Sequence, residues 1–274
     1  MPVRNQSVAT SALGHQFEFH VHPDDELLSN IVRGKNAYST GDVAVFKKFL
    51  KPGDVFIDVG ANIGWYSVVA SLVLGETGKI LAIEPEPRNL ELLRKNLAGV
   101  KTPYEIHAAA VSDEKGTAEL YLSPDNFGDH SLVLDGFKHV SRQKVSVPLE
   151  RLESLITAED FKKTGLLKMD IQGSEPKALV GMSSLLRLHR PVMFIEFSPS
   201  HIYECGSSPF EIFAFIEKWK YFPFQVFDGA SSPDEVLRPI SLDSLFALTK
   251  ELRTANYGID LVLATEPTLD RQWN

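Results

Sequence analysis

The order of hydrophobic and polar positions along this chain predicts strands separated by helices. In QFEFHVH, Gln16–His22, apolar residues occupy every second position, which is typical of a strand with one buried face. Between positions 23 and 50 we expect a helical segment, with Asp42 as a possible N-cap for the apolar residues that follow it. Residues 1–50 are therefore expected to form an N-terminal extension, a strand plus a helix, that packs on the rest of the chain, residues 51–274.

From residue 51 onward, short apolar runs alternate with segments of helical length. Apolar runs without polar alternation are typical of parallel strands that helices cover on both faces. The sequence predicts seven such strands, at Val55–Val59, Lys79–Ile83, Tyr104–His107, Leu166–Met169, Val192–Phe197, Phe224–Phe227 and Asp260–Ala264. It predicts helices between them at Trp65–Leu74, Arg88–Leu97, Glu175–Leu186 and Pro209–Trp219. We therefore expect an α/β fold with a sheet between two layers of helices.

One segment interrupts this order after the third strand. Thr117–Leu122 and Lys144–Val147 have the pattern of short strands, and the loop Ser123–Ser131 lies between them. We therefore expect a small β insertion in the domain. Because the loop combines a glycine with Asp129 and His130, it could close over bound ligands as a lid, and an ordinary surface loop is the alternative.

The segment FIDVGANIGWYS, Phe56–Ser67, predicts a ligand site. In an open parallel sheet, ligands bind at the carboxyl ends of the strands, where this glycine loop lies. Gly60 permits a sharp turn and Gly64 lets the next helix begin close to a ligand, so the loop can present amide N–H groups to an anion. Asn62 and Trp65 stand where the dinucleotide fingerprint G-x-G-x-x-G has glycine, and the phosphate loop GxxxxGK[ST] is absent. A cofactor without a pyrophosphate is therefore favoured.

S-adenosylmethionine meets these requirements. Its carboxylate can accept hydrogen bonds from the loop amides, and Asp58 at the strand end can attract its ammonium group or hold the loop in place. Glu84, at the end of the next strand, can accept hydrogen bonds from both ribose hydroxyls. Loop capping or an exposed surface position is the alternative role for each carboxylate. Because both end successive strands, we favour the cofactor role.

Polar residues near the ends of later strands are candidates for catalysis. A hydroxyl nucleophile needs a base within hydrogen-bond reach. Asp170 directly follows an apolar strand, and Glu196 interrupts one, where a carboxylate is costly unless it is paired or catalytic. Glu175 and His201 complete the set. The alternatives are a helix N-cap for Asp170, a first-turn helix carboxylate for Glu175 and an exposed loop position for His201.

Charge limits the classes of partner that we expect. Acidic residues outnumber basic ones 36 to 28, giving a net charge of −8, which argues against binding to a nucleic acid backbone. No apolar stretch approaches the roughly 18 residues of a membrane helix, and the first residues lack the apolar core of a secretion signal. The single cysteine, Cys205, cannot form an internal disulfide. We therefore expect a cytoplasmic protein that does not bind membranes.

Two histidines near the N-terminus raise the question of a metal site. His20 and His22 share one face of their predicted strand, and Asp24 and Asp25 follow. No second cluster supplies further ligands, and polar alternation on an exposed strand explains the pair. We therefore expect no metal.

Taken in order, seven segments of the chain resemble the FkbM family of S-adenosylmethionine-dependent methyltransferases. They are FIDVGANIGWYS, AIEPEPRNLELLRKNL, HAAAVSDEKGTAELYLS, NFGDHSL, VPLERLESLI, LLKMDIQGSEPKALVGM and PVMFIEFSP. The resemblance covers most of Asp54–Pro199, and IDVGAN-x-G and KMD-x-x-G-x-E in this order are its specific parts. It implies a class I methyltransferase (Rossmann-like) fold, with a seven-stranded sheet whose last strand is antiparallel.

The resemblance also implies roles for single residues. Residues that match the cofactor loop, the ribose carboxylate, the adenine contacts and the position beside the methyl donor are Asp58, Gly60, Asn62, Gly64, Glu84, Val111, Ser112 and Asp170. Family members often carry an acidic residue where this chain has Gln172. The resemblance therefore implies no role for Gln172 that needs a charged side chain.

The expected function is methylation of a hydroxyl group on a small molecule or a sugar. Asp170, Glu196 and His201 are the candidate catalytic residues, and S-adenosylmethionine is the expected cofactor. The alternatives are a nicotinamide-dependent oxidoreductase on a similar sheet and a non-catalytic module that retains the cofactor pocket.

Overall fold

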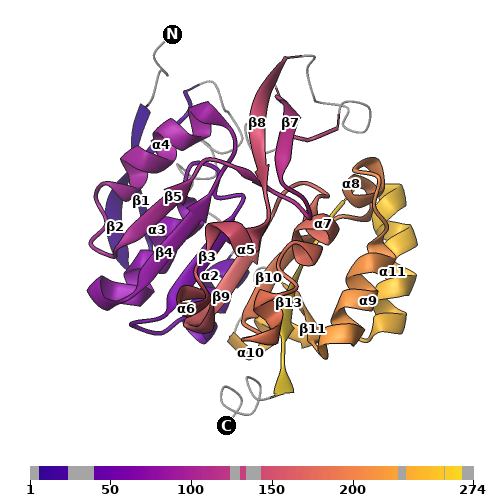
Figure 1. The fold of residues 1–274 in the computed structure, drawn as a ribbon. Helices are drawn as coiled ribbons and strands as arrows, with labels where there is room; N and C mark the ends of the chain where they lie inside the picture. The colour runs from indigo at the N-terminus through magenta and orange to yellow at the C-terminus, as the bar shows by residue number, and fades with distance from the viewer. Residues whose placement is uncertain are drawn as a thin grey trace.

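A sheet between two layers of helices forms the body of the protein (Figure 1). The structure is a computed structural model that describes residues 6–23, 40–123, 130–133, 143–227, 233–255 and 257–266. Within these residues the main sheet has eight strands. In spatial order they are β12 (Leu237–Pro239), β11 (Phe222–Val226), β13 (Ile259–Ala264), β10 (Val192–Phe197), β9 (Thr164–Met169), β3 (Val55–Val59), β4 (Lys79–Ile83) and β5 (Tyr104–His107).

The order and directions of these strands confirm the expected class I fold. Strands β3, β4, β5, β9 and β10 pair in parallel, and β13 is antiparallel to both of its neighbours, β10 and β11. The prediction of seven strands is wrong by one, because β12 adds an antiparallel strand beyond β11. This strand has three residues and includes Arg238 and Pro239, so it carries no strand pattern.

The chain crosses from one side of the sheet to the other between β3 and β9. From β3 it continues outward through β4 to β5, and it then returns to place β9 on the other side of β3. The carboxyl ends of β3 and β9 therefore border the point where strand order reverses, which is where ligands bind in open α/β sheets.

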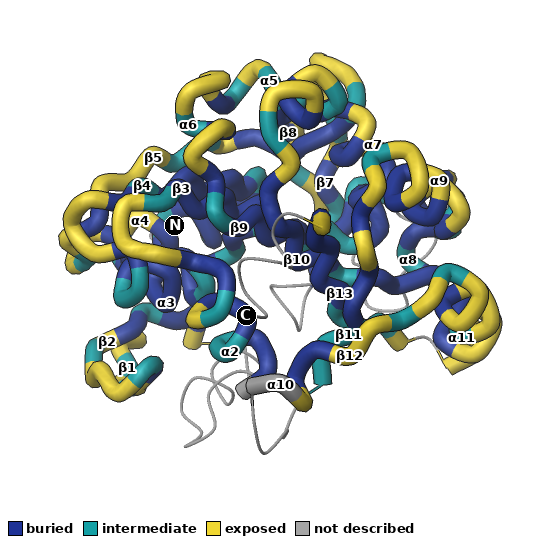
Figure 2. Tube along the Cα trace, turned by 90° about the horizontal axis from the view of Figure 1, so that it is seen from below, coloured by how far each residue is buried: buried dark blue, intermediate teal, exposed yellow. Residues whose placement is uncertain are grey.

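Residues within each central strand point alternately into two separate cores. In β3 all five residues are buried, with Phe56 in the first core and Ile57 in the second. Figure 2 shows the buried central strands between the two helical layers. The first core contains residues of α2 (Thr40–Phe49), α3 (Trp65–Leu74), α4 (Pro87–Leu97) and α10 (Pro233–Val236). The second contains residues of α5 (Leu152–Leu155), α6 (Ala158–Lys162), α7 (Glu175–Val180), α8 (Pro199–Glu204), α9 (Pro209–Trp219) and α11 (Leu242–Ala255).

The helix predicted at Glu175–Leu186 is shorter than expected. It ends at Val180, and a separate 3-10 turn follows at Leu185–Arg187. Gly181 lies between them, and a Cβ atom there would stand 2.0 Å from the carbonyl oxygen of Ser112. The helix therefore ends where the chain packs closely against Ser112.

Another 3-10 turn, Gly75–Thr77, follows α3.

The N-terminal segment forms a hairpin rather than the single strand predicted. Strand β1 (Gln6–Ala12) pairs antiparallel with β2 (His15–Val21). Phe19 of β2 is fully buried, with its ring centroid 5.5 Å from that of Trp65. The amide of His20 donates to Oδ1 of Asn96 at 2.7 Å, and the Asn96 side-chain amide donates back to the His20 carbonyl at 2.9 Å. These contacts join the hairpin to α3 and α4. Of the helical segment expected between positions 23 and 50, residues 24–39 lie outside the described residues.

The expected β insertion is present and has three strands instead of two. It comprises β6 (Ala110–Val111), β7 (Gly116–Tyr121) and β8 (Lys144–Glu150), with a small core of Ala110, Leu120, Leu122 and Val147. In Figure 1, β7 and β8 rise above the main sheet. The insertion therefore stands over the side of the domain where the glycine loop lies.

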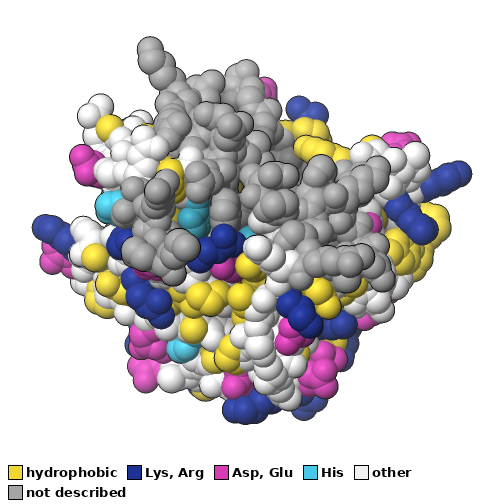
Figure 3. Space-filling model, turned by 90° about the horizontal axis from the view of Figure 1, so that it is seen from above, with side chains coloured by type: hydrophobic (Ala, Val, Ile, Leu, Met, Phe, Trp, Pro, Cys, Tyr) yellow, Lys and Arg dark blue, Asp and Glu magenta, His cyan; other side chains and the backbone are white. Residues whose placement is uncertain are grey.

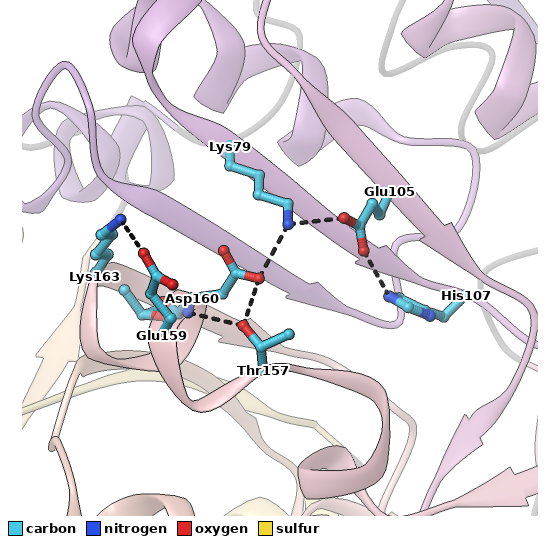
Figure 4. A network of polar contacts seen from close by, with 8 residues as sticks. Lys79, Glu105, His107, Thr157, Glu159, Asp160 and Lys163 are labelled. Atoms are coloured by element: carbon cyan, nitrogen blue, oxygen red, sulfur yellow. Dashed lines mark hydrogen bonds and ion pairs between the residues drawn. The ribbon is translucent and has the colours of Figure 1, made fainter.

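A network of ion pairs connects α6 to the sheet at the amino end of β4 (Figure 4). The Lys79 ammonium lies 3.0 Å from Oδ2 of Asp160 and 2.8 Å from Oε1 of Glu105. These groups are partly exposed, so each pair contributes about 1 kcal/mol or less. The network is at the end of β4 opposite the glycine loop, and it orients α6 without entering the ligand crevice.

No described helix has the length and apolar character needed to cross a membrane.

We expect Phe19→Ala to destabilise the whole domain. Its ring is enclosed against Trp65, so truncation should lower the free energy of unfolding by about 3 to 5 kcal/mol. Phe246→Ala is the control, because Phe246 is 58% exposed and should cost much less. Urea unfolding of both variants measures the difference. If Phe19→Ala unfolds at the same urea concentration as the wild type and with the same change in signal, the hairpin does not unfold together with the rest of the domain.

Candidate functional site

The candidate site begins where the chain leaves β3. The amides of Gly60 and Ala61 both donate to the carbonyl oxygen of Ile83, at 3.0 Å each. Gly60 has a φ of 79°, and a Cβ atom there would stand 2.0 Å from the carbonyl oxygen of Asp170. The loop after β3 therefore touches the loop after β9, and only glycine fits at this contact.

The remainder of the glycine loop is also held in left-handed conformations. Asn62 has a φ of 51° and Gly64 a φ of 91°, and a Cβ atom on Gly64 would stand 2.6 Å from Cδ1 of Leu93. Asparagine tolerates this conformation better than most residues. Helix α3 begins at the next residue, so its first amide groups border the loop.

Two buried acceptor atoms beside this loop have no donor among the described residues. Asp58 is fully buried, and its Oδ2 atom accepts a hydrogen bond of 2.6 Å from the Ser67 hydroxyl, whereas its Oδ1 atom accepts none. Oδ1 of Asn62 is also buried and unpaired within the described part of the chain. Buried acceptors without donors are rare in folded proteins, and they indicate that a ligand or water supplies the missing donors.

Glu84 links the glycine loop to the loop after β4. Its Oε2 atom accepts from the Asn62 amide at 2.9 Å, and its Oε1 atom accepts from the Glu86 amide at 2.9 Å. The side-chain amide of Asn89 is a third donor to this carboxylate. A carboxylate has about four acceptor positions, so about one remains for a ligand. Burial raises the pKa of Glu84 to about 7, although these amide donors favour its charged form. The free protein therefore holds Glu84 partly protonated near neutral pH.

A buried lysine stands between the ends of β3 and β9. Lys168 is 4% exposed and is the only buried lysine or arginine among the described residues. Its ammonium lies 3.3 Å from Oδ2 of Asp170 and 4.5 Å from the ring centroid of Tyr66, and its Cα atom pairs in register with that of Asp58. Burial disfavours its charge, but Asp170 and Asp58 together hold its pKa above the ordinary value. Lys168 therefore acts as the local counter-ion of Asp170.

Asp170 and Glu196 meet through the side chain of Gln172. Its amide nitrogen lies 3.1 Å from Oδ1 of Asp170 and 3.5 Å from Oε2 of Glu196. Burial, with the negative charges of Asp170, Glu175 and Asp260, raises the pKa of Glu196 well above its ordinary range. Two of the three predicted catalytic residues therefore lie together, and Asp170 is not the helix N-cap that we weighed as its alternative.

Glu175 has the role of a helix-end carboxylate. It is 1% exposed, and its Oε1 atom accepts from the amide of Ile171 at 2.9 Å. This bond closes the loop that joins β9 to α7. Burial raises the pKa of Glu175 to about 7. Its position supports the structural alternative over a catalytic one.

His201 lies in the first turn of α8, so the expectation of an exposed loop position is wrong. Burial lowers the pKa of its imidazole, although the charge of Asp170 opposes this effect. The His201 carbonyl oxygen lies where a Cβ atom on Gly173 would be, at 2.2 Å, so α8 packs tightly on the loop after β9. This packing holds the His201 backbone against the loop that follows Asp170.

Val111 and Ser112 lie further along the sheet edge, at the end of β6. Val111 is packed in the second core. The Ser112 hydroxyl donates to Oδ1 of Asp113 at 3.1 Å, and its amide donates to the Glu150 carbonyl at 2.9 Å. These bonds do not join either residue to the glycine loop, and their expected adenine contact stays a prediction.

The described part of the insertion loop, at His130, lies near Arg88 of α4 and His22. The amide of Ser123 donates to Nδ1 of His130 at 3.0 Å, and burial, with the nearby Arg88 and His22, lowers the pKa of His130 to about 3. Asp129 and most of the predicted lid lie outside the described residues. His130 is thus a neutral, enclosed side chain near the start of α4.

The histidines of β2 do not form a metal site with described residues. His22 is buried, and its Nε2 atom lies 2.8 Å from Oδ1 of Asn89. No group of three histidine, cysteine or acidic residues within the described ranges has the arrangement of a metal site. Asp24 and Asp25 lie outside those ranges.

Sequence reasoning missed Lys168 as part of this site. Lys168 interrupts the apolar strand LLKM, and the argument about a buried charge that selected Glu196 applies to it equally. Gln172 was noted only through the family resemblance, and no role was assigned to it. Its place depends on a left-handed backbone, with a φ of 54°, that the sequence does not specify.

Comparisons with known proteins agree with this geometry. The family model described as "Methyltransferase FkbM domain" matches residues 58–223. Over 165 residues the chain is 28% identical to "31-O-demethyl-FK506 methyltransferase FkbM" of Streptomyces tacrolimicus, covering 48% of this chain and 61% of the relative. Over 167 residues it is 29% identical to "Probable cobalt-precorrin-6B C(15)-methyltransferase (decarboxylating)" of Sulfolobus acidocaldarius, covering 60% and 78%. The chain thus spans about three-fifths of the length of the first relative.

Solved structures with a similar fold include a methyltransferase FkbM from Methylobacillus flagellatus KT. That structure aligns with a TM-score of 0.48 at 16% identity, covering 78% of this chain and 44% of the other. An S-adenosylmethionine-dependent O-methyltransferase from Thermotoga maritima aligns with a TM-score of 0.43 at 14% identity, covering 94% and 77%.

We expect Gly60→Ala to disrupt the contact between the loops after β3 and β9. The new methyl group meets the Asp170 carbonyl, and alanine disfavours the positive φ, so the free energy of unfolding should fall by at least about 2 kcal/mol. Gly99→Ala is the matched control, since a Cβ atom there has no neighbour within 4 Å. Thermal unfolding of both variants provides the comparison. Equal midpoints would show that the loops are not in contact.

Proposed function

Because this chain belongs to the FkbM family of methyltransferases, whose cofactor is S-adenosylmethionine, we propose that it methylates a hydroxyl group of a small molecule or a sugar. The observation that carries the proposal is the pair of buried, unpaired acceptor atoms on Asp58 and Asn62 beside the glycine loop. S-adenosylmethionine carries the donors that such acceptors need, an ammonium group and two ribose hydroxyls. A donor that reaches a buried, unpaired acceptor removes the free-energy cost of leaving that acceptor without a hydrogen bond.

The residues that would hold the cofactor surround these two atoms. Gly60 and Gly64 hold the loop in its left-handed turns, and the remaining acceptor position of Glu84 suits a ribose hydroxyl. Asp58, Asn62 and Asp170 supply further acceptors, and Val111 and Ser112 are proposed on the adenine side. When bound, S-adenosylmethionine supplies a methyl group on a positively charged sulfur, which leaves as a neutral thioether.

The acidic residues opposite the loop suit a hydroxyl acceptor. Such an acceptor must lose a proton; Asp170 and Glu196 lie together through Gln172, the charge of Asp170 reaches His201, and these three residues are the proposed bases. The name of the Streptomyces relative specifies methylation at an oxygen, which supports the proposal, whereas that of the Sulfolobus relative specifies a carbon. The cluster of bases therefore favours an oxygen acceptor in this chain.

Charge supports a small acceptor over a nucleic acid. The net charge is −8, and basic and acidic side chains are interspersed over the described part of the face in Figure 3. A nicotinamide dinucleotide is disfavoured by Asn62 and Trp65, which occupy the fingerprint positions where a pyrophosphate needs glycine. A non-catalytic module would bind the cofactor without turnover, and the catalytic variants below distinguish it.

We expect Glu84→Gln to weaken cofactor binding and to remove its pH dependence. Ribose hydroxyls donate to the ionised carboxylate, so binding should lower the pKa of Glu84 from about 7 and release a proton. Wild-type affinity should therefore rise between pH 6 and 8, whereas the variant should be weaker by roughly tenfold or more at pH 8 and independent of pH.

Isothermal titration calorimetry with S-adenosylmethionine and with S-adenosylhomocysteine tests this expectation. Glu91→Gln is the control, because Glu91 pairs with Lys95 on the exposed side of α4. It should bind like the wild type. The absence of binding by either compound to the wild type would refute the proposed function.

We expect Asp170→Asn and Glu196→Gln each to reduce methyl transfer by at least about a hundredfold in kcat/KM, because each removes a carboxylate placed as base or orienting group. A screen of hydroxylated acceptors with methyl-labelled cofactor supplies the assay. Asp243→Asn, on the exposed first turn of α11, should retain full activity. Unchanged turnover in both site variants would remove both carboxylates from the reaction.

A further inference from the structure

Gln172 is held in place by contacts on both sides of its backbone. Its φ of 54° is unusual for a residue with a side chain. The preceding amide, of Ile171, is bonded to Glu175, and the Gln172 carbonyl accepts a hydrogen bond of 3.3 Å from the Cys205 thiol. On the other side, Gly173 packs on the backbone of His201. Strained positions that several contacts maintain are concentrated at functional sites.

This backbone directs the Gln172 amide group between two carboxylates. The amide nitrogen has two hydrogens, which matches one donor to Asp170 at 3.1 Å and a longer contact to Glu196 at 3.5 Å. The Oε1 atom of the same side chain is buried and has no donor among the described residues. The side chain thus connects the two carboxylates and leaves one acceptor for a further group.

The charged groups around Glu196 differ in how they are paired. Carboxylates approach it from β9 (Asp170), α7 (Glu175) and β13 (Asp260), whose Cα atom is its partner across the antiparallel pair. Lys168, the nearest cation of β9, forms its ion pair with Asp170. Asp170 thus has a cation as its direct partner, whereas the pKa of Glu196 is raised well above its ordinary range. When two neighbouring carboxylates have such different surroundings, one can remain charged while the other takes up and releases a proton.

We propose that Gln172 is a positioning residue that holds Glu196 beside Asp170, so that Glu196, and not Asp170 or His201, receives the proton of the acceptor hydroxyl. The inference rests on the proposed function and specifies its proton acceptor. In the proton transfer, the O–H bond of the acceptor breaks, its electron pair stays on the oxygen and the Glu196 carboxylate becomes a carboxylic acid. That proton later passes to solvent.

The two competing groups have other surroundings. Asp170 is already ion-paired with the Lys168 ammonium, at 3.3 Å. Burial lowers the pKa of His201, so its imidazole holds a proton poorly. The Gln172 amide acts on Glu196 in a different way. It favours the ionised form, which is the form that must be present when the acceptor arrives.

The test compares Gln172→Met and Gln172→Glu with the wild type. Methionine keeps the length of the side chain without its donor, and glutamate replaces the donor with a third carboxylate. Both changes should make Glu196 harder to ionise, so the acid limb of the pH profile of kcat should move up by at least one pH unit, with the larger shift in Gln172→Glu. Cofactor affinity should stay within about twofold of the wild type, because the hydrogen bonds of Gln172 go to Asp170, Glu196 and Cys205 and not to Asp58, Asn62 or Glu84.

Infrared difference spectroscopy across a pH titration reads the same group without an acceptor. The carbonyl band of a protonated carboxylic acid should disappear as the pH rises through the pKa of Glu196. This band should be absent from Glu196→Gln. In both Gln172 variants the pH at which it disappears should be higher than in the wild type. Thermal unfolding at a fixed pH separates this effect from a general loss of stability.

Three results would overturn the inference. The first is a Gln172→Met variant with reduced stability but an unmoved acid limb and infrared titration, which indicates a structural role alone. The second is His201→Gln abolishing the acid limb while Glu196→Gln retains it. The third is failure of the wild type to bind S-adenosylmethionine, which refutes the proposed function as well, whereas the first two leave that function intact.

Discussion

The approach of Gly60 to the Asp170 carbonyl is the contact on which the rest of the site depends. It joins the ends of β3 and β9 where strand order reverses, and no side chain fits between them. Because these two loops touch, the unpaired acceptors of the glycine loop and the Asp170 carboxylate lie at the same edge of the sheet. Glu84 extends the arrangement to the next strand by bonding the amides of Asn62 and Glu86. Backbone packing therefore fixes the relative positions of the groups proposed for cofactor and acceptor.

Charge near this contact is asymmetric. Several carboxylates lie within the site, and Lys168 is the one buried lysine or arginine in the described residues. Its ion pair with Asp170 distinguishes that carboxylate from Glu196, and the neutral Gln172 amide contacts both carboxylates.

Much of the architecture was predictable because its signals are local. The bounds of α3 and α9 and of the four strands β3, β4, β5 and β10 came directly from apolar runs and their end signals. Strand β1 was missed because QSVATSA consists of small and polar residues, and it forms a strand only through its pairing with β2. Helix α11 was also missed, although Leu245, Thr249 and Leu252 are buried at helical spacing. A hydroxyl residue within the apolar series weakens that signal.

The site was predicted less completely than the fold. Residues at strand ends could be identified because parallel strands bring their carboxyl ends to one edge. The contacts of Glu175 and Gln172 could not, because they depend on a left-handed turn after β9 and on the packing of α8. His201 was expected in a loop, although Ser198 and Pro199 before it are a helix-start signal that the strand assignment did not use.

The central claim is that the unpaired acceptors beside the glycine loop receive donors from the cofactor. A crystal structure of the wild-type protein with S-adenosylhomocysteine tests it most directly. The account predicts that the ribose hydroxyls bond to Glu84 and that ligand donors, directly or through an ordered water, reach Oδ1 of Asp58 and Asn62. Ligand density away from the carboxyl ends of β3 and β4, with both acceptors still unpaired, would contradict it.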